Sequence, residues 1–63
     1  LTADIIEKYI DDILRYTKKG SAIVFSGILL ERESDILSLC YEKNLDVKKI
    51  IRRGEWTAML VGV

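Results

Sequence analysis

The residues whose side chains could take part in chemistry are few and scattered in this chain. The acidic pair Asp11 and Asp12, the single cysteine Cys40 and the basic pair Arg52 and Arg53 stand out. The chain has no histidine, so it cannot build a histidine base, a catalytic triad or an imidazole metal ligand. One cysteine cannot form a zinc site. We therefore predict no catalytic residue and no metal ligand within these 63 residues.

Each candidate also has a plainer structural interpretation, which we favour. Asp11 and Asp12 fall on the polar face of an expected helix, where carboxylates are solvated. Cys40 has apolar neighbours, so we expect a buried and inert thiol. Arg52 and Arg53 could meet an acidic partner, but charges on an edge strand more often prevent unwanted strand pairing.

Length and composition describe one small globular unit. A chain of 63 residues buries only about 60% of the surface that its unfolded form exposes, so a catalytic cleft with its own walls is not expected. With 49% hydrophobic and 32% charged residues, the composition is nonetheless that of a folded interior. Gly27 and Gly54 lie too far apart to form a glycine-rich phosphate loop, so we do not expect nucleotide binding by this chain.

Charge and cysteine usage limit the partners and the compartment. Ten basic and ten acidic residues cancel and alternate along the chain, so we expect no nucleic acid and no anionic membrane as a direct partner. The apolar runs at residues 22–25 and 58–63 are far shorter than the roughly 20 residues that span a bilayer. A single cysteine fits a reducing compartment, and we expect a cytoplasmic location.

Apolar periodicity predicts a first helix over residues 3–19. Its apolar residues recur at three- and four-residue steps, as in an amphipathic helix: Ile5, Ile6, Tyr9, Ile10, Ile13 and Leu14. Thr2 can cap its start. Lys18 and Lys19 would lie near the negative end of its dipole, before Gly20.

A second helix is predicted over residues 31–43, with Glu31 and Glu33 in its first turn and Asn44 suited to end it. The residues that we expect to face inward, in part, are Ile36, Leu37, Leu39, Cys40 and Tyr41.

Three strands complete the expected fold. Residues 21–26 contain an apolar run without alternation, which predicts a strand buried on both faces. Residues 45–53 carry many charges, as an edge strand does. Gly54 can supply a positive φ angle for a tight turn, after which residues 55–63 form a nearly unbroken apolar strand that favours a central position.

These elements predict an α/β unit with the order α-β-α-β-β and a three-stranded mixed sheet. The last strand would lie centrally, antiparallel to both of its neighbours, and the first and second strands would be joined by a right-handed crossover. A sheet that finishes in this way is typical of Rossmann-like AdoMet-dependent methyltransferases.

The residues themselves resemble the C-terminal third of the ribosomal protein L-eleven methyltransferase (PrmA) family. The similar segments are Leu-Thr-Ala-Asp-Ile-Ile at residues 1–6, Lys-Gly at 19–20, Ser-Gly-Ile-Leu at 26–29 and Gly-Glu-Trp at 54–56. The resemblance covers essentially the whole chain. Lys19 stands where the family usually has proline, and Ser21 where it has a second glycine; both are local turn changes.

The resemblance implies that the chain is a single fragment, residues 1–63, of the catalytic domain of a protein methyltransferase. Its intact form would transfer methyl groups from S-adenosyl-L-methionine to lysine side chains and the N-terminal amine of ribosomal protein L-eleven. Such a displacement depends mainly on positioning of a neutral amine. The family's cofactor-binding motifs would lie upstream of Leu1, so the fragment alone is expected to be inactive and to bind no cofactor.

Within the chain, the resemblance and the sheet topology indicate a few residues near the ligands of the intact enzyme. Leu1 and Thr2 would adjoin the cofactor motif, although Thr2 is more simply a helix cap. Residues at the carboxyl ends of the parallel strands are the substrate-proximal candidates: Ser26, Gly27, Glu55 and Trp56. The plainer alternatives are a turn role for Ser26 and Gly27 and a packed core position for Trp56.

The alternative to a methyltransferase fragment is a small stand-alone α/β interaction module that dimerises through its sheet. In either case, we expect the isolated chain to be a homo-oligomer. Both helices would cover the same sheet face, which leaves the other face and one edge strand without a cover. The parent reading frame distinguishes the two hypotheses, since only an enzyme fragment would follow an asparagine-containing strand end and a glycine-rich loop.

Overall fold

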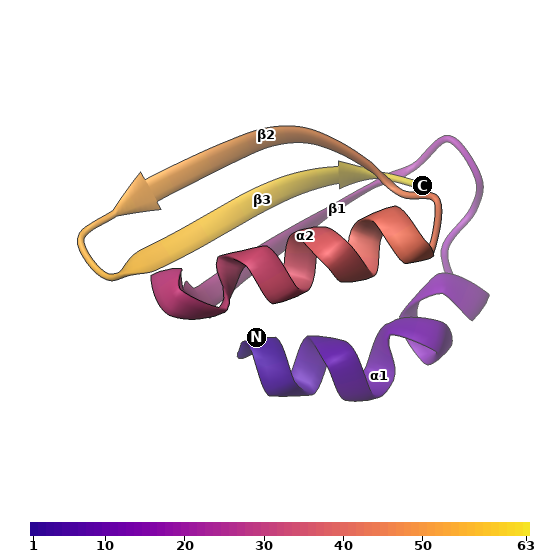
Figure 1. The fold of residues 1–63 in the computed structure, drawn as a ribbon. Helices are drawn as coiled ribbons and strands as arrows, with labels where there is room; N and C mark the ends of the chain where they lie inside the picture. Colours follow the sequence, from indigo (N-terminus) through magenta and orange to yellow (C-terminus); the bar gives the residue numbers. More distant parts are fainter.

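The computed structural model describes residues 1–63 and contains the expected order of elements. Two α-helices, a short 3-10 helix and three strands follow one another along the chain: α1 Ala3–Arg15, β1 Ala22–Leu29, η1 Leu30–Arg32, α2 Glu33–Glu42, β2 Asp46–Arg53 and β3 Trp56–Gly62. Figure 1 shows that the sheet forms one layer and the two helices a second layer, both on the same side of the sheet. Neither helix is long and apolar enough to cross a membrane.

Helix α1 begins where the sequence predicts and ends earlier. The backbone N–H of Ile5 donates to the Thr2 hydroxyl at 3.3 Å, which confirms the predicted cap. The predicted end at Lys19 is wrong, because the helix ends at Arg15. Beyond it, the Thr17 hydroxyl donates to the Ile13 carbonyl at 2.6 Å, an alternative partner for a carbonyl at the helix end. Lys18 and Lys19 therefore lie in the turn, outside the last helical turn.

Strand β1 differs from the prediction in length and in burial. It continues past Ser26 to Leu29, with an irregular register between Phe25 and Ile28. The expectation of burial on both faces is wrong, since Phe25 and Ile28 are fully buried whereas Val24 is 63% exposed. The reason is that both helices lie on one face of the sheet, so the side chains that point the other way meet no second layer (Figure 1).

Helix α2 is shorter than predicted, because residues 30–32 form a 3-10 turn before it. Ile36 and Cys40 are buried against the sheet, as predicted. The inward position predicted for Tyr41 is wrong: this side chain is 87% exposed, since it is one residue, or about 100° of helical rotation, beyond Cys40. The helix ends before Asn44, whose φ of 58° is the left-handed conformation that terminates helices.

The predicted strand order is confirmed. The sheet has the order β1-β3-β2, with β3 in the centre and antiparallel to both neighbours. β1 and β2 therefore run parallel to each other on either side of β3. The description of the sheet as mixed is wrong in one respect, because both hydrogen-bonded pairs are antiparallel. The charged strand β2 forms one edge, as predicted, and a two-residue loop with Gly54 at φ 59° joins it to β3.

The core lies between the helix layer and the sheet. Nine buried residues from both helices, β1 and β3 form it: Ala3, Ile6, Ile10, Phe25, Ile28, Ile36, Cys40, Met59 and Val61. On the opposite face, Val24, Ile51, Ala58 and Leu60 surround a shallow hollow of about 210 Å³ together with Lys49. We call these four apolar residues the open face.

Candidate functional site

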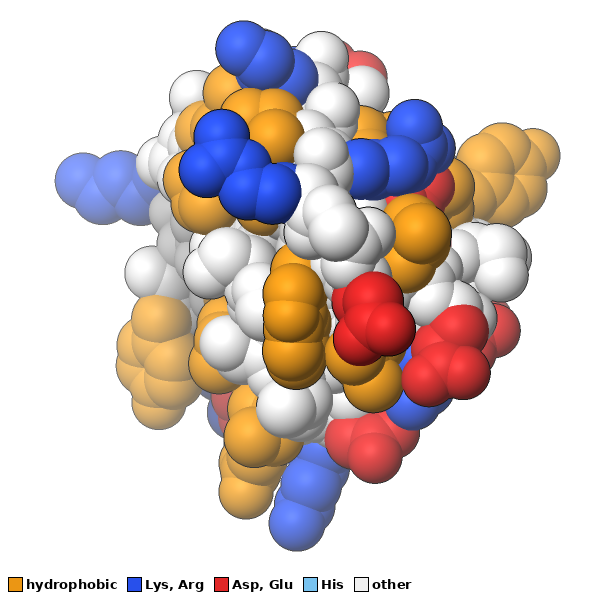
Figure 2. Space-filling model, turned by 90° about the vertical axis from the view of Figure 1, so that its left-hand side faces the viewer, with side chains coloured by type: hydrophobic (Ala, Val, Ile, Leu, Met, Phe, Trp, Pro, Cys, Tyr) orange, Lys and Arg blue, Asp and Glu red, His pale blue; other side chains and the backbone are white.

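One end of the molecule gathers the segments that open α/β sheets use for ligand binding. Parallel strands β1 and β2 end there, and the loop between β2 and β3, the start of α1 and η1 lie beside them (Figure 1). Ligands of open α/β sheets bind outside the carboxyl ends of the strands. Figure 2 faces this end and shows hydrophobic side chains across it, with most of the visible basic side chains above and a group of acidic ones at the lower right. We call this end the rim.

The larger of two cavities at the rim has a volume of about 450 Å³. One wall comes from the end of β1 and from η1, and the other from the hairpin loop; its lining residues are Leu29, Leu30, Glu31, Gly54 and Glu55. The backbone N–H of Leu30 donates to the Glu55 carbonyl at 2.8 Å and so joins the two walls. The cavity thus combines apolar surface with two carboxylates. We call it the rim cavity.

A second cavity of about 220 Å³ lies between the start of α1 and the sheet. Thr2, Gly27 and Trp56 are among the residues that line it. The core position favoured for Trp56 is wrong, because this side chain is 52% exposed. Trp56 lies at the very start of β3, beyond the edge of the helix layer, and therefore borders the cavity.

The predicted site residues lie at the rim, but not all of them line one of its two cavities. Gly27 faces the backbone of Leu1, and its φ of 78° explains why glycine stands there. The turn role expected for Ser26 and Gly27 is wrong, because both lie inside β1, where the register with β3 is interrupted. Such irregularities commonly re-aim side chains next to binding sites. Ser26 is exposed and lines neither cavity, whereas Glu55 lines the rim cavity.

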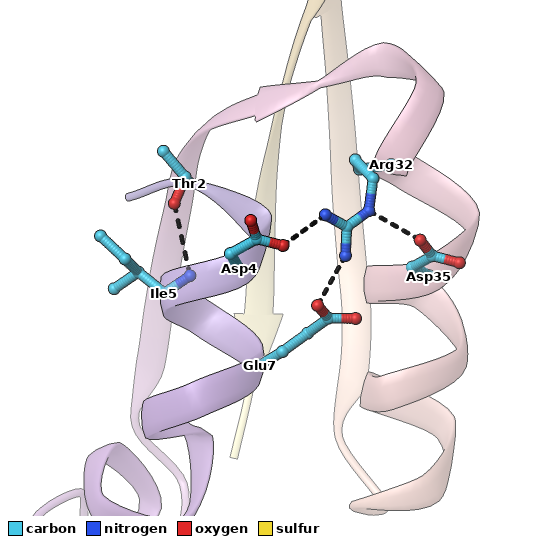
Figure 3. A network of polar contacts seen from close by, with 6 residues as sticks. All are labelled: Thr2, Asp4, Ile5, Glu7, Arg32 and Asp35. Atoms are coloured by element: carbon cyan, nitrogen blue, oxygen red, sulfur yellow. Dashed lines mark hydrogen bonds and ion pairs between the residues drawn. The ribbon is translucent and has the colours of Figure 1, made fainter.

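Sequence reasoning missed a network centred on Arg32, which Figure 3 shows. Its guanidinium donates to Asp4 at 2.6 Å and to Glu7 in α1, and to Asp35 in α2 at 2.7 Å. These charge-assisted bonds, to Asp4 above all, raise the pKa of Arg32, which stays fully protonated. The network holds the start of α1 against η1 and α2. Only the Arg32–Asp35 pair, three residues apart, could be found from spacing.

A second missed network lies at the base of the hairpin. Glu33 is only 8% exposed, and its carboxylate accepts hydrogen bonds from the Arg52 guanidinium and from the Thr57 hydroxyl. Hydrogen bonds from Arg52, and then from Thr57, lower the pKa of Glu33 to about 2. Glu33 is therefore a carboxylate at neutral pH. Arg52 lies on the edge strand β2, is half-exposed and is bound to this carboxylate, and its predicted role in protecting the edge of the sheet stays a prediction.

The other reactive side chains lie where the plainer interpretation put them. Asp11 and Asp12 are exposed and pair with Lys43 and Arg15 at 2.7 and 3.1 Å. Cys40 is buried, and its burial raises the pKa of the thiol, which keeps it protonated. No group of three or more acidic, histidine or cysteine side chains is arranged to hold a metal ion.

The chain is similar in sequence to proteins of one family over nearly its whole length. It matches the family described as "Ribosomal protein L11 methyltransferase (PrmA)" over residues 1–62. Proteins with the name ribosomal protein L11 methyltransferase from Acetivibrio thermocellus and Brevibacillus brevis are 35% and 28% identical, over 97% and 95% of the chain. The alignments cover 21% and 19% of these relatives, so the chain spans about a fifth of their length.

The fold agrees with this similarity. The crystal structure of a ribosomal protein L11 methylase from Lactobacillus delbrueckii subsp. bulgaricus superposes with a TM-score of 0.92. The superposition covers 98% of this chain and 32% of that one, at 19% sequence identity, and therefore shows a shared fold. With the family match over residues 1–62, the chain belongs to the ribosomal protein L11 methyltransferase (PrmA) family.

Proposed function

We propose that this chain is the closing, C-terminal segment of the catalytic domain of an AdoMet-dependent protein methyltransferase. The observation that carries the methyltransferase assignment is the family match over residues 1–62. Because the chain covers about a fifth of its relatives, it would be one segment of such a protein. The strand order β1-β3-β2 supports the C-terminal placement. We expect the sheet of a Rossmann-like methyltransferase to finish in this way, with an antiparallel last strand inserted between two parallel strands.

The proposed reaction transfers methyl groups from S-adenosyl-L-methionine to lysine side chains and the N-terminal amine of a ribosomal protein. The relatives are named ribosomal protein L11 methyltransferase, and we propose ribosomal protein L11 as the partner here too. AdoMet would supply an electrophilic methyl group, which the neutral acceptor amine would take from the sulfonium before losing a proton to solvent. This step needs alignment of the two reactants more than a strong acid or base.

The segment would contribute binding and positioning to this reaction. We propose that Gly27, Glu55 and Trp56 lie near the methyl acceptor, because they line the two rim cavities at the carboxyl ends of the strands. Ser26 would lie next to them on β1. Leu1 and Thr2 would lie nearest the cofactor. Every buried side-chain polar atom of the chain already has a hydrogen-bond partner within it, and we assign AdoMet binding to the rest of the protein.

The parent gene provides the first test. We expect the codons before Leu1 to encode an asparagine-containing strand end and, further upstream, a glycine-rich loop. A stop codon or an unrelated linker there would instead favour the stand-alone interaction module, and a position near the start of a long reading frame would reject the C-terminal placement. We expect the parent protein to be cytoplasmic.

The second test is enzymatic. The intact parent protein, incubated with methyl-labelled AdoMet and ribosomal protein L11, should transfer label to the ribosomal protein. Trp56→Ala should weaken use of the acceptor, and Tyr41→Ala, a matched change at an aromatic residue far from the rim, should not. The absence of transfer to any ribosomal protein would reject the proposed reaction.

We also propose that the isolated 63-residue chain self-associates. Val24 and Ile51 on the open face are 63% and 51% exposed, and β1 pairs on one side only. Burial of a few hundred square ångströms of apolar surface, at about 25 cal/mol per Å², would contribute several kcal/mol to association. A symmetric dimer is the simplest closed arrangement.

A further inference from the structure

We propose that Glu33 is a positioning residue that fixes the two walls of the rim cavity relative to each other. The inference deepens the proposed function, on which it rests for the identity of the ligand: the methyl acceptor would bind in this cavity. Glu33 itself lines neither cavity. Its effect would be exerted through the elements that it joins.

Glu33 is attached to the wall formed by the end of β1 and η1. It is the first residue of α2 and follows η1 directly, so only Arg32 separates it from the lining residue Glu31, which follows the lining residue Leu30. Its backbone N–H donates to the Leu30 carbonyl, which ties it to that turn. A displacement of Glu33 would therefore move η1 with it.

The carboxylate of Glu33 reaches across to both strands of the hairpin that forms the other wall. The Arg52 Nε of β2 donates to Oε2 at 2.8 Å and to Oε1 at 3.1 Å, and its Nη2 also donates to Oε1. The Thr57 hydroxyl of β3 donates to Oε2 at 2.7 Å. Arg52 and Thr57 face each other in the sheet, one pair away from the loop formed by Gly54 and Glu55.

The arrangement is specific in a way that ordinary packing is not. Glu33 is 8% and Thr57 only 2% exposed, and a carboxylate so placed is tolerated only when its oxygens are satisfied. Two apolar side chains could fill the same space, but they would not fix how the hairpin is oriented relative to α2. Hydrogen bonds from both strands to one carboxylate do fix this orientation. The walls are also joined by the Leu30–Glu55 backbone bond at 2.8 Å and by the pairing of Leu29 with Trp56 between β1 and β3. The Glu33 carboxylate adds side-chain hydrogen bonds to both strands of the hairpin, β2 as well as β3.

The first experiment measures loop order in the 63-residue chain by ¹⁵N relaxation. Thr57→Val removes the hydroxyl and keeps a similar shape, and Glu33→Gln removes the charge. Thr17→Val is the matched control, because the Thr17 hydroxyl bonds to Ile13 at the other end of α1. We expect the amide order parameters of Gly54 and Glu55 to fall from about 0.85 to about 0.6 in both test variants, and to stay unchanged in the control.

Loop residues that stay rigid in a folded Thr57→Val chain would overturn the positioning role, and Thr57→Ser should restore the order. Because Thr57→Val leaves the Glu33–Arg52 ion pair in place, it decides the question even if Glu33→Gln does not fold. This measurement requires no activity. It therefore tests the positioning role separately from the proposed methyl transfer.

The second experiment measures steady-state kinetics of the intact parent protein. With Thr57→Val we expect KM for the ribosomal protein to rise about tenfold and kcat to change less than about twofold, the pattern of lost binding without lost chemistry. Thr57→Ser should restore KM. A normal KM despite a loosened loop would overturn the assignment of the acceptor to the rim cavity.

Discussion

The backbone of Leu1 lies so close to Gly27 that a Cβ atom on residue 27 would stand 3.2 Å from the Leu1 carbonyl oxygen. This contact fastens the segment before α1 to the irregular part of β1. It also brings the residue that we propose to lie nearest the cofactor against one proposed to lie near the methyl acceptor. Glycine is required there for two reasons, the close approach and a φ of 78°.

Gly27→Ala should therefore destabilise the chain by about 1 to 3 kcal/mol, since a side chain there is strained and crowded. Gly20→Ala is the control: Gly20 also has a positive φ, of 91°, but nothing lies within 4 Å of its Cβ position. In urea unfolding, the free energy of unfolding should fall more for Gly27→Ala than for Gly20→Ala, and the difference would measure the contact with Leu1. Equal losses at the two positions would leave only backbone strain.

Acid should weaken the fold through Glu33. In the unfolded chain this carboxyl takes up a proton near its usual pKa of 4.5, but in the folded chain only near 2. Between these values the unfolded state binds more protons, so the free energy of unfolding should fall as pH decreases from about 5 to about 2. Urea titrations at several pH values should show a shallower dependence for Glu33→Gln. Equal slopes would mean that the Glu33 pKa is not lowered.

Loss of the Arg32 network should loosen the helix layer. Arg32→Met keeps much of the side chain's length but removes its bonds to Asp4, Glu7 and Asp35. We expect the melting temperature to fall by a few degrees, because single exposed pairs contribute little but three carboxylates share this guanidinium. High salt should reduce the difference between the two proteins. Arg15→Met, which removes a single exposed pair with Asp12, should have a smaller effect.

The 63-residue chain alone should not bind AdoMet. We assign the residues that hold the ribose and the methionine moiety to the rest of the parent protein, where the family resemblance puts the cofactor motifs. Isothermal titration calorimetry should give no saturable heat. Saturable binding at micromolar cofactor would show that the cofactor site lies within these residues.

Self-association of the isolated chain should depend on the open face. Val24→Lys places a charge on that face and should weaken association by about tenfold or more. Tyr41→Lys is the control, since Tyr41 is 87% exposed on α2, in the helix layer. Sedimentation equilibrium at micromolar concentration measures both. A monomer at all concentrations would show that the open face does not drive association.

The sequence by itself determined that two helices and three strands follow one another and in which order the strands lie in the sheet, but not where each element ends. Thr2 is a side-chain cap with a local partner, so the start of α1 was predictable. The charges of β2 and the apolar run of β3 identified the edge and the central strand, because a buried strand cannot carry many unpaired charges. Gly54 identified the turn between them.

The tertiary structure alone decided which apolar residues are covered and which charges meet. Apolar patterns show that Val24 and Trp56 favour burial, but not whether a second layer exists to bury them, and both are more than half exposed. Arg32 meets Asp4, and Glu33 meets Thr57, across separations in sequence that no local spacing rule spans. Such contacts depend on the position of the helices on the sheet, which is determined by packing of the whole core.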